Sequence, residues 1–245
     1  KRIAFDDFHA SIVVDGPRSS DIDELANRNF DYLVSGSDQL WNPDIFGSLD
    51  PSFFLQFGHA DKRVSLAASM GSHELTEQEK KTVKRYLLGY DFLSVRERSL
   101  RLQLEELTGA PVFEILDPTL LIRADEWRSH LVGRTSFDEP CPYILLYLIG
   151  VSPSYYEEHY SEIVLSLKRL TGYKVLLVRH DDLPHSGVDG VLSRLTPWEL
   201  AEYIDNASLV ISSSFHGIAF SANFDTPFVV IDNPANPDRV HNLLD

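Results

Sequence analysis

The sequence predicts an α/β protein with two Rossmann-like domains and a cleft between them. Three observations support this fold class. Short apolar runs alternate with helical patterns along the chain, as is typical of parallel βαβ units. The strands after residue 142 are nearly continuous apolar runs, as expected of a sheet buried on both faces. Between the two series, residues 123–142 lose their periodicity and contain Gly133, Pro140 and Pro142. We therefore predict an N-terminal domain over residues 1–132 and a C-terminal domain over residues 141–245.

In the N-terminal domain, we expect strands over residues 32–34, 64–68 and 92–95. A helix between the second and third strands begins after Thr76, because Glu79 three residues later completes a capping box. Four basic residues form its solvated face: Lys80, Lys81, Lys84 and Arg85.

In the C-terminal domain, strands are expected over residues 143–148, 174–178, 209–211 and 228–231. Ser152 and Pro153 open a long helix after the first of these strands. Thr196 and Glu199 form a second capping box, with Pro197 at the first helical position.

The composition is that of a soluble globular protein: 43% of the 245 residues are hydrophobic and 24% are charged. The formal charge of −15, from 37 acidic and 22 basic residues, disfavours nucleic acid and anionic membranes as partners. Cys141 is the single cysteine, so no intrachain disulfide can form, and we expect a cytoplasmic protein.

No run approaches the ~20 apolar residues of a membrane span. The sequence lacks a cysteine cluster and a His-Glu-x-x-His motif, so we expect no required metal and no bound cofactor. Both ends lack the signals that start or stop an element, and we expect the chain to be truncated at each.

The strongest local feature is the polar segment Ser212 to Gly217, between the strand at 209–211 and a helix. The N–H groups at such a helix start suit a phosphate or a carboxylate. His216 would lie at the carboxyl edge of the sheet and can exchange protons near neutral pH. Alternatively, the serines only cap the helix and His216 packs under the loop.

Two further polar segments follow strands of the N-terminal domain. After the strand at 32–34, Gly36 permits close backbone approach to a ligand, and Asp38 can bind a sugar hydroxyl or act as a base. Alternatively, the segment is an ordinary turn, with Trp41 in the core. After the strand at 92–95, Arg96 can grip a carboxylate or phosphate through two parallel hydrogen bonds. Alternatively, it forms a salt bridge to the neighbours of Glu97 or has a solvated side chain.

Two more charged residues follow strands of the predicted sheets. Asp117 precedes a proline and is more consistent with a role in the loop than with ligand binding. Arg239 follows the final strand and is a second candidate for the anionic group of a ligand.

Four motifs in order resemble the polysaccharide pyruvyl transferase family. They are Ser35-Gly36-Ser37-Asp38-Gln39-Leu40-Trp41-Asn42, Ser94-Val95-Arg96-Glu97, Asp117-Pro118-Thr119-Leu120-Leu121 and Ser213-Ser214-Phe215-His216-Gly217. The resemblance implies a fold like that of the GT-B glycosyltransferases and a role in bacterial cell-surface polysaccharide biosynthesis. It also implies phosphoenolpyruvate as the donor and a saccharide or lipid-linked oligosaccharide as the acceptor.

The resemblance also implies roles for single residues. His216 is expected as the catalytic acid or base, and Asp38 as the residue that orients the acceptor. The expected substrate-binding residues are Gly36, Ser37, Gln39, Arg96, Ser213, Ser214, Phe215, Gly217 and Arg239. Some members carry an arginine two positions before the histidine, where this chain has Ser214, so another residue must hold the anionic group.

Two other functions remain open at this stage. A nucleotide-sugar glycosyltransferase of the same architecture would need a base-stacking site, for which Trp198 and Tyr203 are candidates. A non-catalytic saccharide-binding relative would keep the fold without the chemistry. The sequence leaves the acceptor sugar, its linkage and the oligomeric state undetermined.

Overall fold

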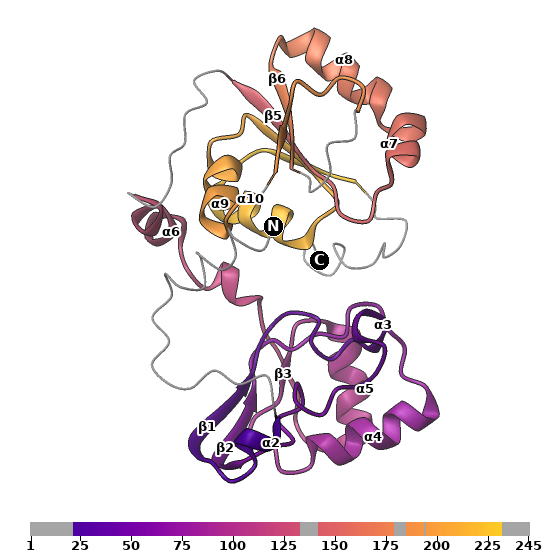
Figure 1. The fold of residues 1–245 in the computed structure, drawn as a ribbon, viewed down its shortest axis with the longest axis vertical. Coiled ribbons are helices and arrows are strands. Elements are labelled where there is room, and N and C mark those ends of the chain that lie inside the picture. Colours follow the sequence, from indigo (N-terminus) through magenta and orange to yellow (C-terminus); the bar gives the residue numbers. More distant parts are fainter. Residues whose placement is uncertain (1–21, 133–141, 179–184, 194, 232–245) are drawn as a thin grey trace. The chain divides into compact units, whose positions relative to one another are not determined.

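A computed structural model describes residues 22–132, 142–178, 185–193 and 195–231 (Figure 1). The chain divides into two compact units between Leu121 and Ile122, and each unit is described by itself. Both are α/β units with parallel strands, as predicted. The cleft expected between them stays a prediction.

The described residues of the N-terminal unit form four parallel strands. β1 (Asn29–Ser35) pairs with β2 (His59–Ser65), and β3 (Ser94–Val95) pairs with β4 (Phe113–Glu114). Isolated parallel bridges, Val64 with Phe92 and Ala68 with Val95, join the two pairs. The carboxyl ends of all four strands therefore lie along one edge.

The part of this unit that the structure describes also contains five helical segments: α2 (Ile22–Leu25), α3 (Pro43–Phe46), α4 (Glu77–Leu87), α5 (Arg98–Thr108) and the 3₁₀ turn η1 (Pro118–Leu120). The predicted capping box of Thr76 and Glu79 is confirmed at the start of α4. The apolar sides of α4 and α5 pack into one core with Trp41 and Phe54.

The bounds predicted for the second strand, residues 64–68, are wrong. β2 ends at Ser65, and Ala67 is fully buried with a left-handed backbone φ of 53°. A left-handed residue cannot continue a strand, because an extended backbone requires a negative φ.

The C-terminal unit contains a five-stranded parallel sheet of order β7-β6-β5-β8-β9. Its strands are β5 (Tyr143–Tyr147), β6 (Lys174–Val178), β7 (Gly190–Leu192), β8 (Leu209–Ser212) and β9 (Phe228–Val230). Its helices are α6 (Ala124–Leu131), α7 (Pro153–His159), α8 (Ser161–Thr171), α9 (Pro197–Asp205) and α10 (Phe215–Phe224). The single long helix expected after Ser152 is therefore wrong, since two helices meet at Tyr160.

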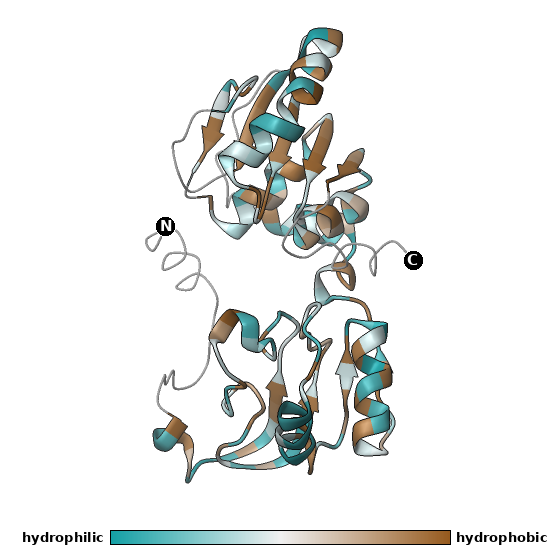
Figure 2. Cartoon of the chain, turned by 90° about the vertical axis from the view of Figure 1, so that its right-hand side faces the viewer, coloured by the Kyte–Doolittle hydropathy of each residue, from teal (hydrophilic) through white to brown (hydrophobic). Residues whose placement is uncertain are grey.

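Both faces of this sheet are buried, as predicted. Alternate residues of β5 belong to different cores: Tyr143 and Leu145 to the core that contains α6, α9 and α10, and Ile144 and Leu146 to the core that contains α7 and α8. The helices cover the two faces of the sheet (Figure 1), and the strands are almost entirely hydrophobic (Figure 2). A double-sided core explains why these strands are continuous apolar runs.

The strand order changes direction between β5 and β8. From β5 the chain winds outward through β6 to β7, and then returns to the other side of β5 as β8. In open α/β sheets, ligands bind outside the carboxyl ends of the strands at such a switch point. A ligand is therefore expected at the loops after Tyr147 and Ser212.

The predicted domain boundary after residue 132 is wrong, because α6 packs with the C-terminal unit. The rings of Trp127 and Phe220 lie 5.1 Å apart, and the Arg128 guanidinium bonds the Asp205 carboxylate at 2.7 Å. Leu131 is buried in the same core. The expected irregular segment over residues 123–142 therefore begins with a helix of the C-terminal unit and does not mark the division.

Candidate functional site

The candidate residues lie after the carboxyl ends of parallel strands, in one group in each unit. One group follows β8 and begins α10; the other follows β1 and β3. Arg239 lies outside the described residues.

His216 is the second residue of α10, the helix that follows β8 at the switch point of the sheet. Its side chain is half-buried, whereas the neighbouring Phe215 is buried. The two rings meet edge to face, with centroids 5.4 Å apart. The histidine is therefore beside a helix N-terminus, where a phosphate or carboxylate is favoured.

The three serines before His216 hold the loop in place. The Ser212 hydroxyl donates to the Tyr147 carbonyl at 2.8 Å and accepts from the Ser214 N–H at 3.0 Å. Ser214 is the N-cap of α10, and its hydroxyl accepts from the Gly217 N–H at 3.4 Å. The capping role weighed for the serines is thus observed, and substrate binding by Ser213 and Ser214 stays a prediction.

Ser213 connects this loop to the loop after β5. Its buried hydroxyl accepts from the Ile149 N–H at 2.8 Å and donates to the Ile149 carbonyl at 3.0 Å. The loops on the two sides of the switch point are therefore fixed to each other beside His216.

Gly217 is required by close packing at the same place. A Cβ at this position would lie 2.5 Å from the Ser212 hydroxyl and 2.8 Å from a ring carbon of Tyr147. Only glycine lets the first turn of α10 approach β5 and β8 this closely.

In the N-terminal unit, the segment after β1 forms a turn with Trp41 in the core, which is the alternative to a ligand-binding segment. The Asp38 carboxylate accepts from the Gln39 N–H at 2.8 Å, and Gln39 is buried, with its side-chain oxygen accepting from Asn42 at 2.7 Å. Trp41 is fully buried and stacks on Phe54. Asp38 itself is exposed, and its role in binding an acceptor stays a prediction.

Gly36 and Ser37 are half-buried at the start of this turn. A Cβ on Gly36 would meet no atom within 4 Å. The fold therefore leaves room for a ligand beside this glycine.

Arg96 is buried and forms a salt bridge with Asp117. Its Nη1 lies 2.7 Å from the Asp117 carboxylate and its Nη2 lies 3.1 Å from the Ser69 hydroxyl. The other Asp117 oxygen accepts from the N–H and hydroxyl of Thr119, which confirms the predicted loop role of Asp117. Binding of a substrate by Arg96 stays a prediction.

Electrostatics hold Asp117 in its charged form. Burial raises its pKa, but the hydrogen bonds from Thr119 and from Arg96 together outweigh this effect and leave the pKa below its usual range. The Arg96 and Asp117 side chains are 6% and 1% exposed, so the pair is shielded from solvent and salt.

Glu97 is a polar residue of this group that the sequence reasoning did not select. It follows Arg96 and is 4% exposed, and one of its oxygens accepts from the Ser69 hydroxyl. Its position in the segment Ser94 to Glu97, at a strand end, was the signal that could have identified it.

The stacking site required by the glycosyltransferase alternative is not evident. The Trp198 ring lies 6.1 Å from the Trp127 ring, and the Tyr203 ring lies 6.1 Å from the Tyr143 ring. Both side chains are half-buried against the core of the unit. These contacts favour a packing role.

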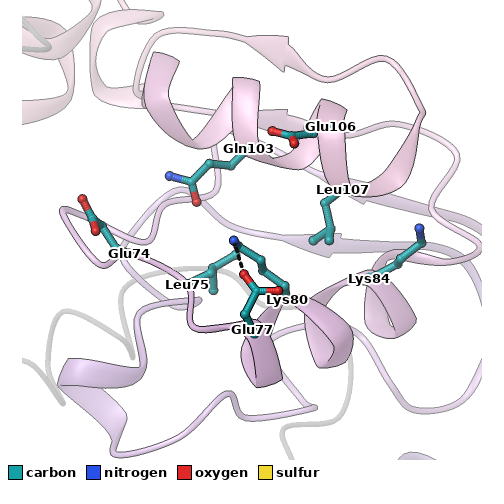
Figure 3. Close-up of a pocket in the computed structure, with 8 residues that line it drawn as sticks. All are labelled: Glu74, Leu75, Glu77, Lys80, Lys84, Gln103, Glu106 and Leu107. Carbon is teal, nitrogen blue, oxygen red and sulfur yellow. Dashed lines mark hydrogen bonds and ion pairs between the residues drawn. The ribbon is translucent and has the colours of Figure 1, made fainter.

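A surface pocket of about 510 Å³ lies between α4 and α5 of the N-terminal unit (Figure 3). The Lys80 ammonium and the Glu77 carboxylate pair within it at 2.7 Å. Glu74 and Glu106 also line it, so its charges are of both signs. None of the predicted site residues contributes to it.

The described residues contain neither a metal-binding cluster nor a membrane-spanning helix. In the part of the chain that the structure describes, no three His, Cys, Asp or Glu side chains gather in a way that could hold a metal ion. Over the same residues, no helix has both the length and the hydropathy of a membrane span.

Comparisons with solved structures give distant similarities. The chain is 14% identical to E. coli heptosyltransferase WaaC with ADP-2-deoxy-2-fluoro heptose, over 88% of this chain and 65% of that one, with a TM-score of 0.47. It is 16% identical to the iron-containing dodecameric glycosyltransferase TibC from enterotoxigenic E. coli H10407, over 39% and 28%, with a TM-score of 0.31. A D-isomer specific 2-hydroxyacid dehydrogenase family protein from Aeromonas salmonicida subsp. salmonicida A449 is 14% identical, over 76% and 63%, with a TM-score of 0.21. The matches thus span less than two thirds of the length of each of these proteins.

No curated protein sequence matches the chain. The sequence model of the family described as polysaccharide pyruvyl transferase matches residues 3–235, nearly the whole chain, and spans all four motifs. The chain therefore belongs to the polysaccharide pyruvyl transferase family.

Proposed function

We propose that the protein transfers pyruvate from phosphoenolpyruvate to two hydroxyls of a saccharide, forming a cyclic ketal and releasing phosphate. The observation that carries this proposal is the position of His216, which begins a helix at the switch point of a parallel sheet. Family membership supplies the reaction class, and a helix N-terminus suits the donor's anionic groups.

The chemistry requires an acid and a base. A proton adds to the methylene carbon of phosphoenolpyruvate, and C2 becomes an oxocarbenium-like centre that the first hydroxyl attacks, losing its proton. The bond from C2 to the phosphate oxygen then breaks, phosphate leaves, and the second hydroxyl attacks C2 and loses its proton. The products are one ketal and one inorganic phosphate.

His216 is the proposed proton-transfer residue, either as the acid for the methylene carbon or as the base for a hydroxyl. The two assignments differ in the pH dependence of the rate. An acid must be protonated, so activity would fall as the pH rises through the His216 pKa. A base gives the opposite dependence.

The other proposed roles follow the groups described above. The N–H groups at the start of α10 stabilise charge as phosphate departs, and Arg96 binds the donor. Asp38, exposed after β1, orients the acceptor. A saccharide or lipid-linked oligosaccharide is the proposed acceptor, and the cytoplasm is the proposed location.

The test is phosphate release from phosphoenolpyruvate in the presence of a panel of glycans, with mass spectrometry of the glycan. His216→Ala should reduce the rate by at least 100-fold, the range of a lost general acid or base. His130→Ala is the matched control, because His130 is an exposed histidine on α6 of the same unit. Full activity in His216→Ala would refute the assignment.

A binding titration separates the rival function. Phosphoenolpyruvate and a set of nucleotide sugars are titrated in turn into the protein. Binding of a nucleotide sugar without binding of phosphoenolpyruvate would support the glycosyltransferase instead. Binding of a glycan with no phosphate release from any donor would support a non-catalytic relative.

A further inference from the structure

Glu97 carries a buried oxygen that has no hydrogen-bond partner among the described residues. The residue lies between β3 and α5 and is 4% exposed. One carboxyl oxygen, Oε1, accepts from the Ser69 hydroxyl and lies 3.5 Å from the Arg96 Nε. The other, Oε2, is buried and unpaired.

An ionised carboxylate is costly in such a place. Burial of a charge without full compensation by hydrogen bonds is far less favourable than burial of the neutral acid. Burial indeed raises the pKa of Glu97, and the hydrogen bonds from Ser69 and Arg96 only partly oppose this effect. The geometry thus favours the protonated form.

The charges around Glu97 lead to the same conclusion. Arg96, at the end of the same strand, is already paired with Asp117 at 2.7 Å. Glu97 is the N-cap of α5, a position that favours a negative charge, but its side chain makes no capping hydrogen bond. Of the basic residues that begin α5, Arg98 is exposed and Arg101 pairs with Glu105 at 2.8 Å.

An ionised Glu97 would therefore leave the group of Arg96, Glu97 and Asp117 with one net negative charge in a buried place. A neutral Glu97 leaves it with none. This difference matters for a ligand that carries phosphate and carboxylate groups, because like charges at close range repel.

We propose that Glu97 is a positioning residue, held as a neutral acid, which fixes Ser69 and the Arg96 guanidinium and keeps this sheet edge able to accept an anionic ligand. The inference rests on the proposed function for the identity of that ligand, phosphoenolpyruvate. It predicts that ligand binding weakens as Glu97 loses its proton, by up to tenfold per pH unit for one coupled proton.

The first test needs no ligand. The ¹³C resonance of the Glu97 carboxyl is assigned by comparison with Glu97→Gln and followed from pH 4 to pH 9. We expect Glu97 to keep its proton to a higher pH than an exposed glutamate does. Ionisation complete by pH 6, as for an ordinary glutamate of pKa ~4.3, would overturn the inference.

The second test compares phosphoenolpyruvate affinity in the wild type, Glu97→Gln and Glu97→Ala from pH 6 to pH 8.5. Glutamine resembles the neutral acid. At pH 6, the phosphoenolpyruvate affinity of Glu97→Gln should therefore be within about twofold of the wild-type affinity. The affinity of Glu97→Gln should also lack the additional decrease that we expect for the wild type at high pH. The phosphate group of phosphoenolpyruvate itself titrates at about pH 6. This effect is the same for the wild type and each variant, so it cancels from the comparison.

Glu97→Ala should bind at least tenfold more weakly, since the contacts to Ser69 and Arg96 are lost. Glu114→Gln is the control, because Glu114 is an exposed glutamate on β4 of the same unit. Equal pH dependence in the wild type and Glu97→Gln would overturn the inference, as would a Glu97→Gln protein that does not fold. If phosphoenolpyruvate binds to no variant, the proposed function fails, while the ligand-free titration still decides the state of Glu97.

Discussion

The Ser213 hydroxyl bonds both backbone groups of Ile149, accepting from its N–H at 2.8 Å and donating to its carbonyl at 3.0 Å. One side chain thus connects the loop after β8 with the loop after β5. Because these strands flank the switch point, the pair holds the two loops together beside His216.

Ser213→Ala removes both hydrogen bonds. We expect a loss of about 1 to 2 kcal/mol in the free energy of unfolding, the usual cost of leaving buried polar groups unpaired. The rate of phosphate release should fall as well, since the His216 loop loses its support. Chemical denaturation measures the first effect, and Ser193→Ala, at an exposed serine of the same unit, is the control. Equal stability of the two variants would contradict this role.

Gly217→Ala places a methyl group against Ser212 and Tyr147, at 2.5 Å and 2.8 Å. Both neighbours belong to strand ends that cannot move freely, so we expect a loss of about 1 to 3 kcal/mol, typical of overpacking. The first turn of α10 should shift, and activity should fall with it. Circular dichroism on heating gives the stability, and an unchanged melting temperature would show that the strands adjust.

Gly36→Ala is the contrasting glycine substitution. Its Cβ would meet no atom within 4 Å, so stability should change by less than about 0.5 kcal/mol. If the acceptor approaches this part of the turn, the added methyl group should raise the KM for the glycan several-fold with little change in kcat. An unchanged KM would exclude Gly36 from the binding surface.

Asp117→Asn tests the buried ion pair. It leaves the Arg96 guanidinium without its carboxylate in a site where both side chains are almost inaccessible. Breaking one side of such a pair costs about 3 to 5 kcal/mol. Asp125→Asn is the matched control, because Asp125 pairs with Arg123 at the surface and should show no measurable change. A small effect in Asp117→Asn would show that water enters the site.

Much of this arrangement was predictable from local patterns. The capping boxes at Thr76 and Thr196 were correctly placed, and so were the four strands expected in the C-terminal unit, because short-range hydrogen bonds and periodicity determine them. The short edge strand β7 was not predicted. The strand-to-helix junction at His216 was also correct. These features need no knowledge of distant partners.

Features that depend on distant contacts were not predictable. The assignment of α6 to the C-terminal unit rests on Trp127 and Arg128, whose partners lie more than 70 residues away. Ala67 ends β2 through a backbone angle that the sequence Ala-Ala does not signal. The role proposed for Glu97 depends on its hydrogen bond with Ser69, a residue that only the tertiary structure brings near.

His73 supplies a pH-dependent contribution to stability. Its ring nitrogens lie 3.0 Å from the Asp44 carboxylate and 3.2 Å from that of Glu79, so it links α3 to the capping box of α4. Burial lowers the His73 pKa, but the hydrogen bonds with Asp44 and Glu79 raise it by more, and the net pKa is above its usual value.

A raised histidine pKa stabilises the fold only while the ring is protonated. The contribution is fully present below the unfolded pKa of about 6.5 and disappears as the pH rises through the folded value. The difference in unfolding free energy between the wild type and His73→Ala should therefore be larger at pH 5.5 than at pH 8.5. Because Asp44 is largely exposed, we expect this change to be below about 1 kcal/mol. His59→Ala, at an exposed histidine of the same unit, should show no such trend. A difference that grows with pH would mean that the neutral ring is the favoured form.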